Sequence, residues 1–244
     1  MTGWLDEYER KARLIPGLVA VLPVAFAVVG LGLRSSPVIA LLVGVGSSVG
    51  LPVVLANYVR HQGQMLQDRL FSKWDGSPAL RRLRHRGDDS KAYTRDRLRG
   101  HVSEITRLTL PDETAETGDP EKADAIYADA VNQVIRRTRD KKQFRLLFEE
   151  NKNYGFARNL LAMRRVGLAI SAASCAALGT GVVLTLTGVT HGQLTNTVVG
   201  AAVDALWVIG WMAVPSEDQV HRAGEAYADR LFEASWVLEP GAAS

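Results

Sequence analysis

The sequence predicts an all-α membrane protein in which two transmembrane helical hairpins enclose a mainly helical cytoplasmic insertion. Three observations carry this prediction: four apolar runs almost free of charge, a basic segment between the second and third runs, and a very short connection within each pair of runs. An apolar run of about 20 residues crosses the hydrocarbon core of a bilayer as a helix. Helices of soluble proteins usually have one polar face, and these runs have none.

The apolar runs define the expected organisation of the chain. They cover residues 14–33, 37–59, 166–190 and 194–214, and Asp204 is the one charged residue in them. We therefore expect an N-terminal segment at 1–13, a first hairpin at 14–59, a basic domain at 60–165, a second hairpin at 166–214 and an amphipathic C-terminal helix at 215–244. The mean hydropathy of −0.01 conceals this pattern, because the charged domain offsets the spans.

The charges predict the orientation in the membrane. Residues 60–165 contain 23 Lys and Arg against 16 Asp and Glu, a net charge of +7, whereas the whole chain has +3. Basic residues remain preferentially on the cytoplasmic side of a membrane. We expect both termini and the basic domain in the cytoplasm, because basic residues flank the spans on that side: Arg10, Lys11, Arg13, Arg60, Arg164 and Arg165.

Asp204 lies near the middle of the fourth run. An ionisable group at that depth is costly and usually faces a bundle interior or water. One interpretation is a neutral, protonated side chain bonded to Ser171 or Ser174. The other is a residue that lines a conducting path, where a symmetric oligomer would place a ring of acids that favours cations. The sequence leaves both open.

A cluster of arginines follows a turn in the first part of the basic domain. Asp75-Gly76 before Pro78 is typical of a turn. Four guanidinium groups then fall within six residues, at Arg81, Arg82, Arg84 and Arg86. Because guanidinium groups match phosphate geometry, these residues are candidates for binding a nucleotide or oligonucleotide. A solvated helix face, or a patch on anionic lipid headgroups, explains the cluster equally well.

Other residues predict where helices begin and which helix faces pack. Asp119 before Pro120 predicts a helix start, and Ser216 with Gln219 fits a capping box. Two helix faces are expected to pack: Ala123, Ile126, Ala130 and Val134 in the basic domain, and Ala169, Ala173, Ala177 and Gly181 between membrane helices. The tail helix is expected to bury a stripe at Val220, Ala223, Tyr227, Leu231 and Leu238.

Catalytic motifs are absent from the sequence. It contains no phosphate-binding glycine loop with Lys-Ser/Thr, no H-E-x-x-H and no nucleophile elbow. The five histidines lack metal-ligand spacing. We therefore expect neither an enzyme nor a metal or cofactor site.

The stretch before the third apolar run combines acids, asparagines, aromatics and arginines. Within it, Asn151, Tyr154, Gly155, Phe156 and Arg158 are candidates for a joint that transmits motion from the basic domain to the membrane helices. Gly155 is expected to break or bend the chain. Simple anchoring at the membrane interface explains the same residues, because aromatics collect there.

Two segments carry a resemblance to a known group. T-R-D-K-K-Q-F-R-L-L-F-E-E-N-K-N-Y-G-F-A-R-N-L-L (138–161) and K-W-D-G-S-P (73–78), together with the predicted layout, resemble the membrane effectors of bacterial anti-phage nucleotide-signalling operons, such as the Hailong system. The resemblance implies a location in the bacterial inner membrane, a nucleotidyltransferase partner, a nucleotide-type signal and membrane disruption as the output. It assigns no ligand residue.

These expectations lead to one function and one alternative. The leading hypothesis is a homo-oligomeric ion channel or pore that a signal or partner enzyme gates at the basic domain. The alternative is a non-conducting membrane anchor or scaffold that recruits a cytoplasmic partner through the same domain.

Overall fold

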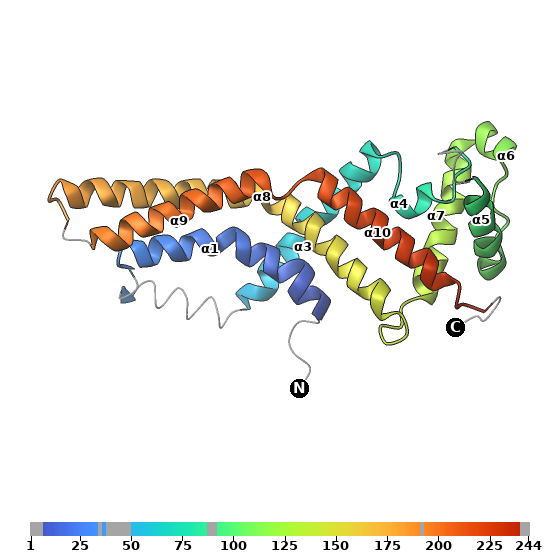
Figure 1. The fold of residues 1–244 in the computed structure, drawn as a ribbon, viewed down its shortest axis with the longest axis horizontal. Helices are drawn as coiled ribbons and strands as arrows, with labels where there is room; N and C mark the ends of the chain where they lie inside the picture. The colour runs from blue at the N-terminus through green and yellow to red at the C-terminus, as the bar shows by residue number, and fades with distance from the viewer. Residues whose placement is uncertain (1–6, 34–35, 38–49, 87–91, 191–192, 240–244) are drawn as a thin grey trace. The chain divides into compact units, whose positions relative to one another are not determined.

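The computed structural model describes residues 7–33, 36–37, 50–86, 92–190 and 193–239, which form helices and turns and include no strand. The all-helical prediction is confirmed. In chain order the elements are η1 (Glu9–Leu14, a π-helix), α1 (Ile15–Gly30), α3 (Leu51–Lys73), α4 (Pro78–Arg81), α5 (Ala92–Thr106), α6 (Glu113–Gly118), α7 (Pro120–Arg137), α8 (Arg145–Leu186), α9 (Leu194–Ala213) and α10 (Glu217–Ser235) (Figure 1).

Three helices among the described residues are long and apolar enough to cross a membrane. They are the continuous rod of η1 and α1 (Glu9–Gly30), α8 and α9. Most of the second predicted span, residues 38–49, lies outside the described residues, as do the connections at 34–35 and 191–192. Membrane association is therefore supported by three helices, while the fourth span and the two-hairpin layout remain predictions.

Helix α8 is longer than the sequence pattern predicts. It runs for 42 residues, so the expected boundary at 165/166 falls inside it. Gly155 neither breaks nor interrupts this helix. A β carbon at Gly155 would lie 2.7 Å from the Tyr8 hydroxyl and 3.1 Å from the β carbon of Ala12. The glycine therefore allows the N-terminal helix to pack closely against α8.

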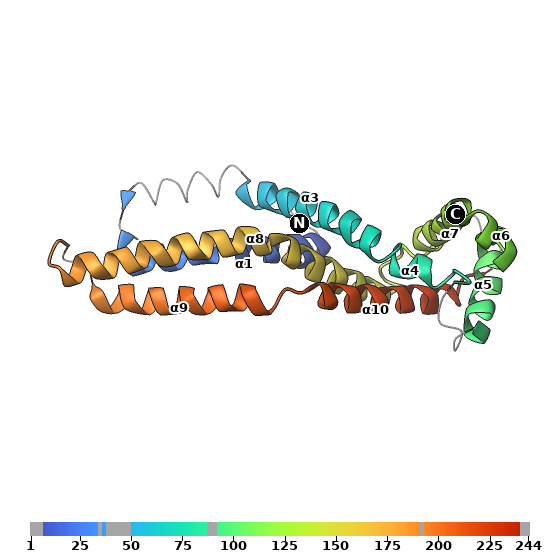
Figure 2. The same ribbon diagram turned by 90° about the horizontal axis from the view of Figure 1, so that it is seen from above.

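The chain divides into two compact units. The first, here called the apolar unit, comprises Met1–Gln67 and Gly155–Gln219, and the second, the arginine unit, comprises Asp68–Tyr154 and Val220–Ser244. Helices α3, α8 and α10 each contribute residues to both units. Within the apolar unit, α1, α9 and the part of α8 after Gly155 lie side by side in both views (Figures 1 and 2).

A proline organises the packing of the apolar unit. Pro23 has no amide hydrogen, so the carbonyl oxygen of Val19 loses its partner within α1. The indole nitrogen of Trp207 on α9 donates to this oxygen over 3.1 Å. The hydroxyl of Ser174 on α8 donates to the carbonyl oxygen of Pro23 over 2.7 Å. A membrane interior supplies no water for such groups, so these bonds from neighbouring helices make the proline tolerable.

Glycines bring the three helices close together. A β carbon on Gly200 would lie 3.5 Å from the α carbon of Gly30, and the hydroxyl of Thr197 donates to the Gly30 carbonyl oxygen over 2.8 Å. On α8, Gly167 receives the indole ring of Trp211. These contacts follow the rule that small residues permit close approach of membrane helices.

The small-residue face predicted on α8 is not the face that packs within the chain. Ala169, Ala173 and Ala177 are exposed in the single chain, so their packing in an oligomer remains a prediction. The buried face is shifted around the helix and consists of Met163, Gly167, Ser171, Ser174 and Leu178.

The arginine unit has its own apolar core. Asp119 caps α7 by accepting from the Lys122 amide over 3.1 Å, which confirms the predicted helix start. Tyr127, rather than Ile126, is fully buried on α7 beside the predicted Ala123, Ala130 and Val134. Residues of α4, α5, α7, α8 and α10 complete this core, among them Leu83, Val102, Leu147, Leu231 and Phe232.

Helix α10 begins as the sequence predicts. The Ser216 amide donates to the Gln219 side chain over 3.2 Å, and the Gln219 amide donates to the Ser216 hydroxyl over 3.3 Å, which confirms the capping box. The buried stripe differs in part from the expected one, because Gly224 and Ala228 replace Ala223 and Tyr227. Gly224 fits beside the ring of Tyr154, which would lie 3.4 Å from a β carbon there.

Replacing Gly167 with alanine tests the packing of the apolar unit. The new β carbon would lie 2.3 Å from the Trp211 indole, so we expect Gly167→Ala to destabilise the protein by about 1–3 kcal/mol. Thermal unfolding in detergent micelles measures the effect. The control is Gly179→Ala on the same helix, where a β carbon meets no atom within 4 Å. Equal melting temperatures for the two variants would contradict the packing described here.

Candidate functional site

The turn predicted at Asp75 ends α3 and begins the candidate site. Asp75 and Gly76 both have positive φ, 57° and 110°, and the Gly76 amide donates to the Phe71 carbonyl oxygen over 2.7 Å. A positive φ of this size suits glycine. Ser77 then caps α4 through the Leu80 amide at 3.2 Å, with Pro78 in the first turn. The turn and the short helix together deliver the arginine-rich segment 81–86.

Arg84 is the most enclosed of the four clustered arginines, with 4% of its surface exposed. Its guanidinium donates to both carboxylate oxygens of Asp124 on α7, over 2.7 and 2.5 Å, and to the Asp75 carboxylate over 2.7 Å. Two parallel bonds to one carboxylate form the strongest geometry available to arginine. Arg84 therefore fixes the segment and is not available to a ligand.

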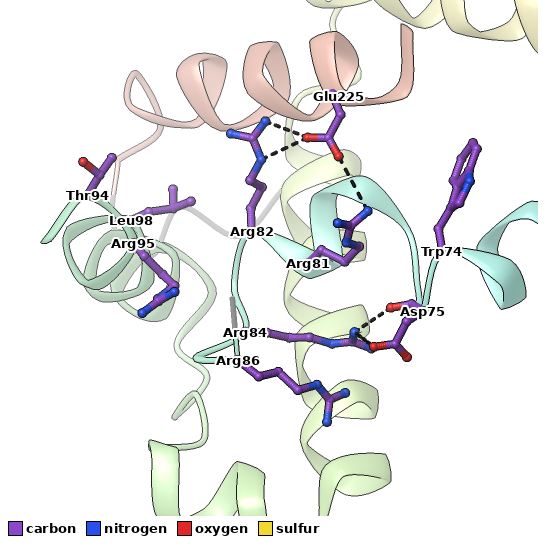
Figure 3. A pocket seen from close by; sticks show the side chains of 10 residues that line it. All are labelled: Trp74, Asp75, Arg81, Arg82, Arg84, Arg86, Thr94, Arg95, Leu98 and Glu225. Carbon is purple, nitrogen blue, oxygen red and sulfur yellow. Dashed lines mark hydrogen bonds and ion pairs between the residues drawn. The ribbon is translucent and has the colours of Figure 1, made fainter. Parts of the chain in front are cut away.

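The other three arginines also contact acids. Arg82 donates to Glu225 on α10 over 2.7 and 3.3 Å and contacts Asp229. Arg81 lies 3.9 Å from Glu225 and 3.3 Å from the His221 ring nitrogen. Figure 3 shows Arg81 and Arg82 reaching the same carboxylate.

Arg86 contacts acids of α6 and α7. Its guanidinium lies 3.0 Å from Asp124 and 3.7 Å from Glu116. The cluster predicted from sequence is thus real as a spatial group, but acids already partner each of its members.

The four clustered arginines line a cavity of about 450 Å³ (Figure 3). A fifth arginine, Arg95 of α5, enters the same cavity, and its buried Nε has no hydrogen-bond partner among the described residues. Trp74 and Leu98 supply apolar walls. Among the described residues, the acids of the lining are Asp75 and Glu225, so the described lining has more cations than anions.

A buried network holds the arginine segment in place, and no sequence pattern predicts it. The Glu116 carboxylate, 3% exposed, accepts from the backbone amides of His85 at 2.8 Å and Arg86 at 3.3 Å and from the Tyr127 hydroxyl at 2.7 Å. Arg99 bonds to the carbonyl oxygens of Leu83 and Pro111. Helix α6, which carries Glu116, spans six residues and has no apolar periodicity, so no pattern marks Glu116.

Hydrogen bonding sets the ionisation of this network. Burial alone would raise the pKa of Glu116, but the bonds from His85, Tyr127 and Arg86 outweigh it and hold the pKa below its ordinary value. Burial and the bond to Glu116 raise the pKa of Tyr127 to about 12, against the opposing effect of Arg99. At neutral pH the carboxylate is therefore charged and the phenol is protonated.

Asp204 is fully buried in the apolar unit. Neither carboxyl oxygen accepts a hydrogen bond of ordinary geometry from a described residue. The two serines expected as partners donate elsewhere, Ser171 to the Gly167 carbonyl oxygen over 2.7 Å and Ser174 to that of Pro23. Asp204 thus lies within the helix packing of one chain.

The proposed joint residues fall in both units. In the arginine unit, Asn151 lines a small cavity and Tyr154 stacks on Tyr227 with ring centroids 6.2 Å apart. In the apolar unit, Phe156 is half-buried and Arg158 is buried, with its guanidinium 2.6 Å from the Gln67 side-chain oxygen.

Asn159, which sequence reasoning overlooked, belongs to the same region of the apolar unit. It accepts from Arg158 over 3.1 Å and donates to the Ala12 carbonyl oxygen over 2.6 Å. It also packs on Gly63 of α3. Arg158 and Asn159 therefore tie α8 to α3 and to the N-terminal helix.

Comparison with protein-family models, curated proteins and solved structures finds no match for this chain. The described residues also contain no group of three or more His, Cys, Asp or Glu placed to hold a metal ion. The chemistry of the site is therefore argued from its own geometry.

Glu116→Gln tests the buried network. An amide presents one acceptor oxygen in place of a carboxylate, so we expect a loss of about 1–3 kcal/mol at neutral pH. The pKa of Glu116 is lowered by folding, so its contribution is complete above the unfolded value and is lost as the pH falls through the folded value. The difference in melting temperature between parent and variant should shrink in acid. Exposed Glu104, changed to Gln, is the control. A pH-independent difference would refute the electrostatic account.

Proposed function

We propose that the protein is an oligomeric, gated membrane effector of a bacterial anti-phage defence system, controlled by a nucleotide-type signal at the arginine unit. The observation that carries the proposal is the cavity lined by five arginines, where the Nε of Arg95 has no partner in the described part of the chain. Its volume of about 450 Å³ lies within the range of small-molecule sites. The three apolar helices provide the membrane part of an effector.

The ion pairs suggest how a phosphate would act. Arg81 and Arg82 contact Glu225 of α10, and a phosphate that binds these arginines would compete with that carboxylate. Exchange of partners would release α10 from the segment after α4. A ligand shifts a conformational equilibrium only through different affinities for the two states. The competition between phosphate and Glu225 supplies that difference.

Helix continuity supports a route from the signal to the membrane. Helix α8 runs without interruption from Arg145 in the arginine unit to Leu186 in the apolar unit. A change at Asn151 or Tyr154 would pass along the same helix to Gly155, Phe156 and Arg158, the proposed joint. We further propose the inner membrane as the location, with both termini cytoplasmic, a homo-oligomer as the conducting form and a nucleotidyltransferase as the partner.

One observation favours the alternative function, a non-conducting scaffold. The clustered arginines are already paired with acids on α7 and α10. A network of this kind could hold the arginine unit in shape for a protein partner without binding any ligand. The two functions differ in whether the cavity binds a phosphate-bearing molecule and whether the membrane becomes conductive.

Arg95→Gln and Arg81→Gln test ligand binding. Each removes a cation from the cavity but leaves the buried pairs of Arg84 intact. Loss of one charge-assisted hydrogen bond should weaken binding by about tenfold or more and reduce its salt dependence. The probe is a fluorescently labelled single-stranded DNA oligonucleotide, measured by anisotropy with inorganic triphosphate as competitor. Arg222→Gln, on the exposed face of α10, is a control of equal charge. Equal affinity of all three variants and the parent would exclude the cavity as the site.

Asp204→Asn tests the conducting path. The amide has nearly the same shape, so we expect the fold to persist. If Asp204 contributes to the path, cation selectivity in a planar bilayer should fall, because a negative charge has been removed. Unchanged current and selectivity would instead assign Asp204 to helix packing. A parent protein that never conducts, with the oligonucleotide or its partner present, would favour the scaffold.

A further inference from the structure

The apolar unit carries a groove of about 350 Å³ with an almost entirely apolar lining. Its walls come from Val19 of α1, Leu160 of α8 and the face of α9 that presents Trp207, Gly210 and Trp211, and Pro215 lies at one end. The indole nitrogen of Trp207 is engaged by the Val19 carbonyl oxygen. The groove therefore offers a ligand carbon surface and no free hydrogen-bonding group from this ring.

The exposed apolar residues around the groove indicate that it faces lipid acyl chains. Leu206 and Val214, which also line it, are 68% and 53% exposed on helices of membrane-spanning length and composition. In a bilayer such surfaces face acyl chains, since the hydrocarbon region contains no water to fill a groove. A volume of this size is sufficient for part of one chain, as it falls within the range of small-ligand sites.

One arginine marks the end of the groove at Pro215, and a second follows it directly in the sequence. The Arg164 guanidinium donates to the carbonyl oxygens of Met212 over 2.9 Å and Pro215 over 3.5 Å. A cation is favourable at this position, because the C-terminus of helix α9 carries a partial negative charge. Arg165, the next residue on α8, is exposed. Both precede the third apolar run directly, which places them at the depth of lipid headgroups.

We propose that the groove binds one acyl chain of an anionic phospholipid, whose headgroup phosphate contacts Arg165 and Arg164. Charge complementarity selects the lipid class, because basic sites between membrane helices attract anionic headgroups. Zwitterionic lipids carry an ammonium group that offsets this attraction. The inference does not depend on ion conduction or on a ligand in the arginine cavity.

Filling the groove is the decisive experiment. A β carbon at Gly210 meets no atom within 4 Å, so Gly210→Leu fits without a clash and occupies the groove. The full chain is extracted from vesicles of phosphatidylcholine and phosphatidylglycerol, and native mass spectrometry counts the retained lipids. The parent should retain phosphatidylglycerol preferentially. Gly210→Leu should retain it at least about tenfold less, because losing contact with even two methylene groups has that effect.

The control for added bulk is Gly179→Leu, on α8 and outside the groove, where a β carbon also meets open space. It should keep the lipid. Retention by Gly210→Leu equal to that of Gly179→Leu overturns the proposal. A Gly210→Leu variant that changes the oligomeric state while the parent retains no lipid also overturns it, in favour of a second copy of the chain as the occupant.

The headgroup is tested separately with Arg165→Gln, which leaves the Arg164 bonds to α9 in place. This variant should keep a bound lipid but lose the preference for phosphatidylglycerol over phosphatidylcholine. Quenching of tryptophan fluorescence by brominated acyl chains should persist in Arg165→Gln and fall in Gly210→Leu. An unchanged preference in Arg165→Gln overturns the anionic assignment.

Discussion

The arginine unit depends on the ion pairs that the guanidinium group of Arg84 makes with Asp75 and Asp124. This group connects three parts of the chain: the turn after α3 through Asp75, the segment after α4 that carries it, and α7 through Asp124. A buried charge is costly unless its partners are well placed, and Arg84 has two carboxylates and the Asp75 carbonyl oxygen within reach. Gly76 belongs to the same arrangement, because a β carbon there would lie 3.2 Å from the guanidinium.

The apolar unit is governed by a different constraint, which is the satisfaction of backbone oxygens without water. Pro23 frees the Val19 oxygen, and Trp207 binds it; the last turn of α1 leaves the Gly30 oxygen, and Thr197 binds it. Each donor comes from α9, so hydrogen bonding and close glycine packing select the same pair of helices. The carboxyl oxygens of Asp204, on the same helix, have no such partner among the described residues, and the same holds for the buried Nε of Arg13 and Nε1 of Trp211.

Local signals in the sequence predicted three membrane-length helices and two helix starts. Three of the apolar runs are continuous stretches of sequence, and the cap at Asp119 and the capping box at Ser216 each depend on residues three positions apart; the structure confirms them. The start of α8 at Arg145 was not predicted, because the apolar pattern begins only at residue 166. The site depended on contacts across long separations. Arg82 and Glu225 lie 143 residues apart in sequence, and no periodicity links them.

The same distinction explains why two helix faces buried within the chain differ from those expected. A spacing of four residues identified Ala169, Ala173 and Ala177 as one face, but small size does not reveal whether a face meets its own chain. Similarly, α7 shows a helical period that both Ile126 and Tyr127 could satisfy. Tyr127 is buried because its hydroxyl finds Glu116, a partner that becomes visible only when α6 is placed beside α7.

The distribution of charge shows why composition alone overstates the basic character of the site. Residues 60–165 have a net charge of +7, whereas residues 215–244 contain six acids and two arginines, a net charge of −4. Glu225 and Asp229 of that tail contact Arg82. Part of the positive charge is thus neutralised by a segment remote in sequence. The carboxylates of α10 therefore lower the net positive charge that residues 81–86 present, and the proposed phosphate ligand would have to compete with Glu225 for Arg81 and Arg82.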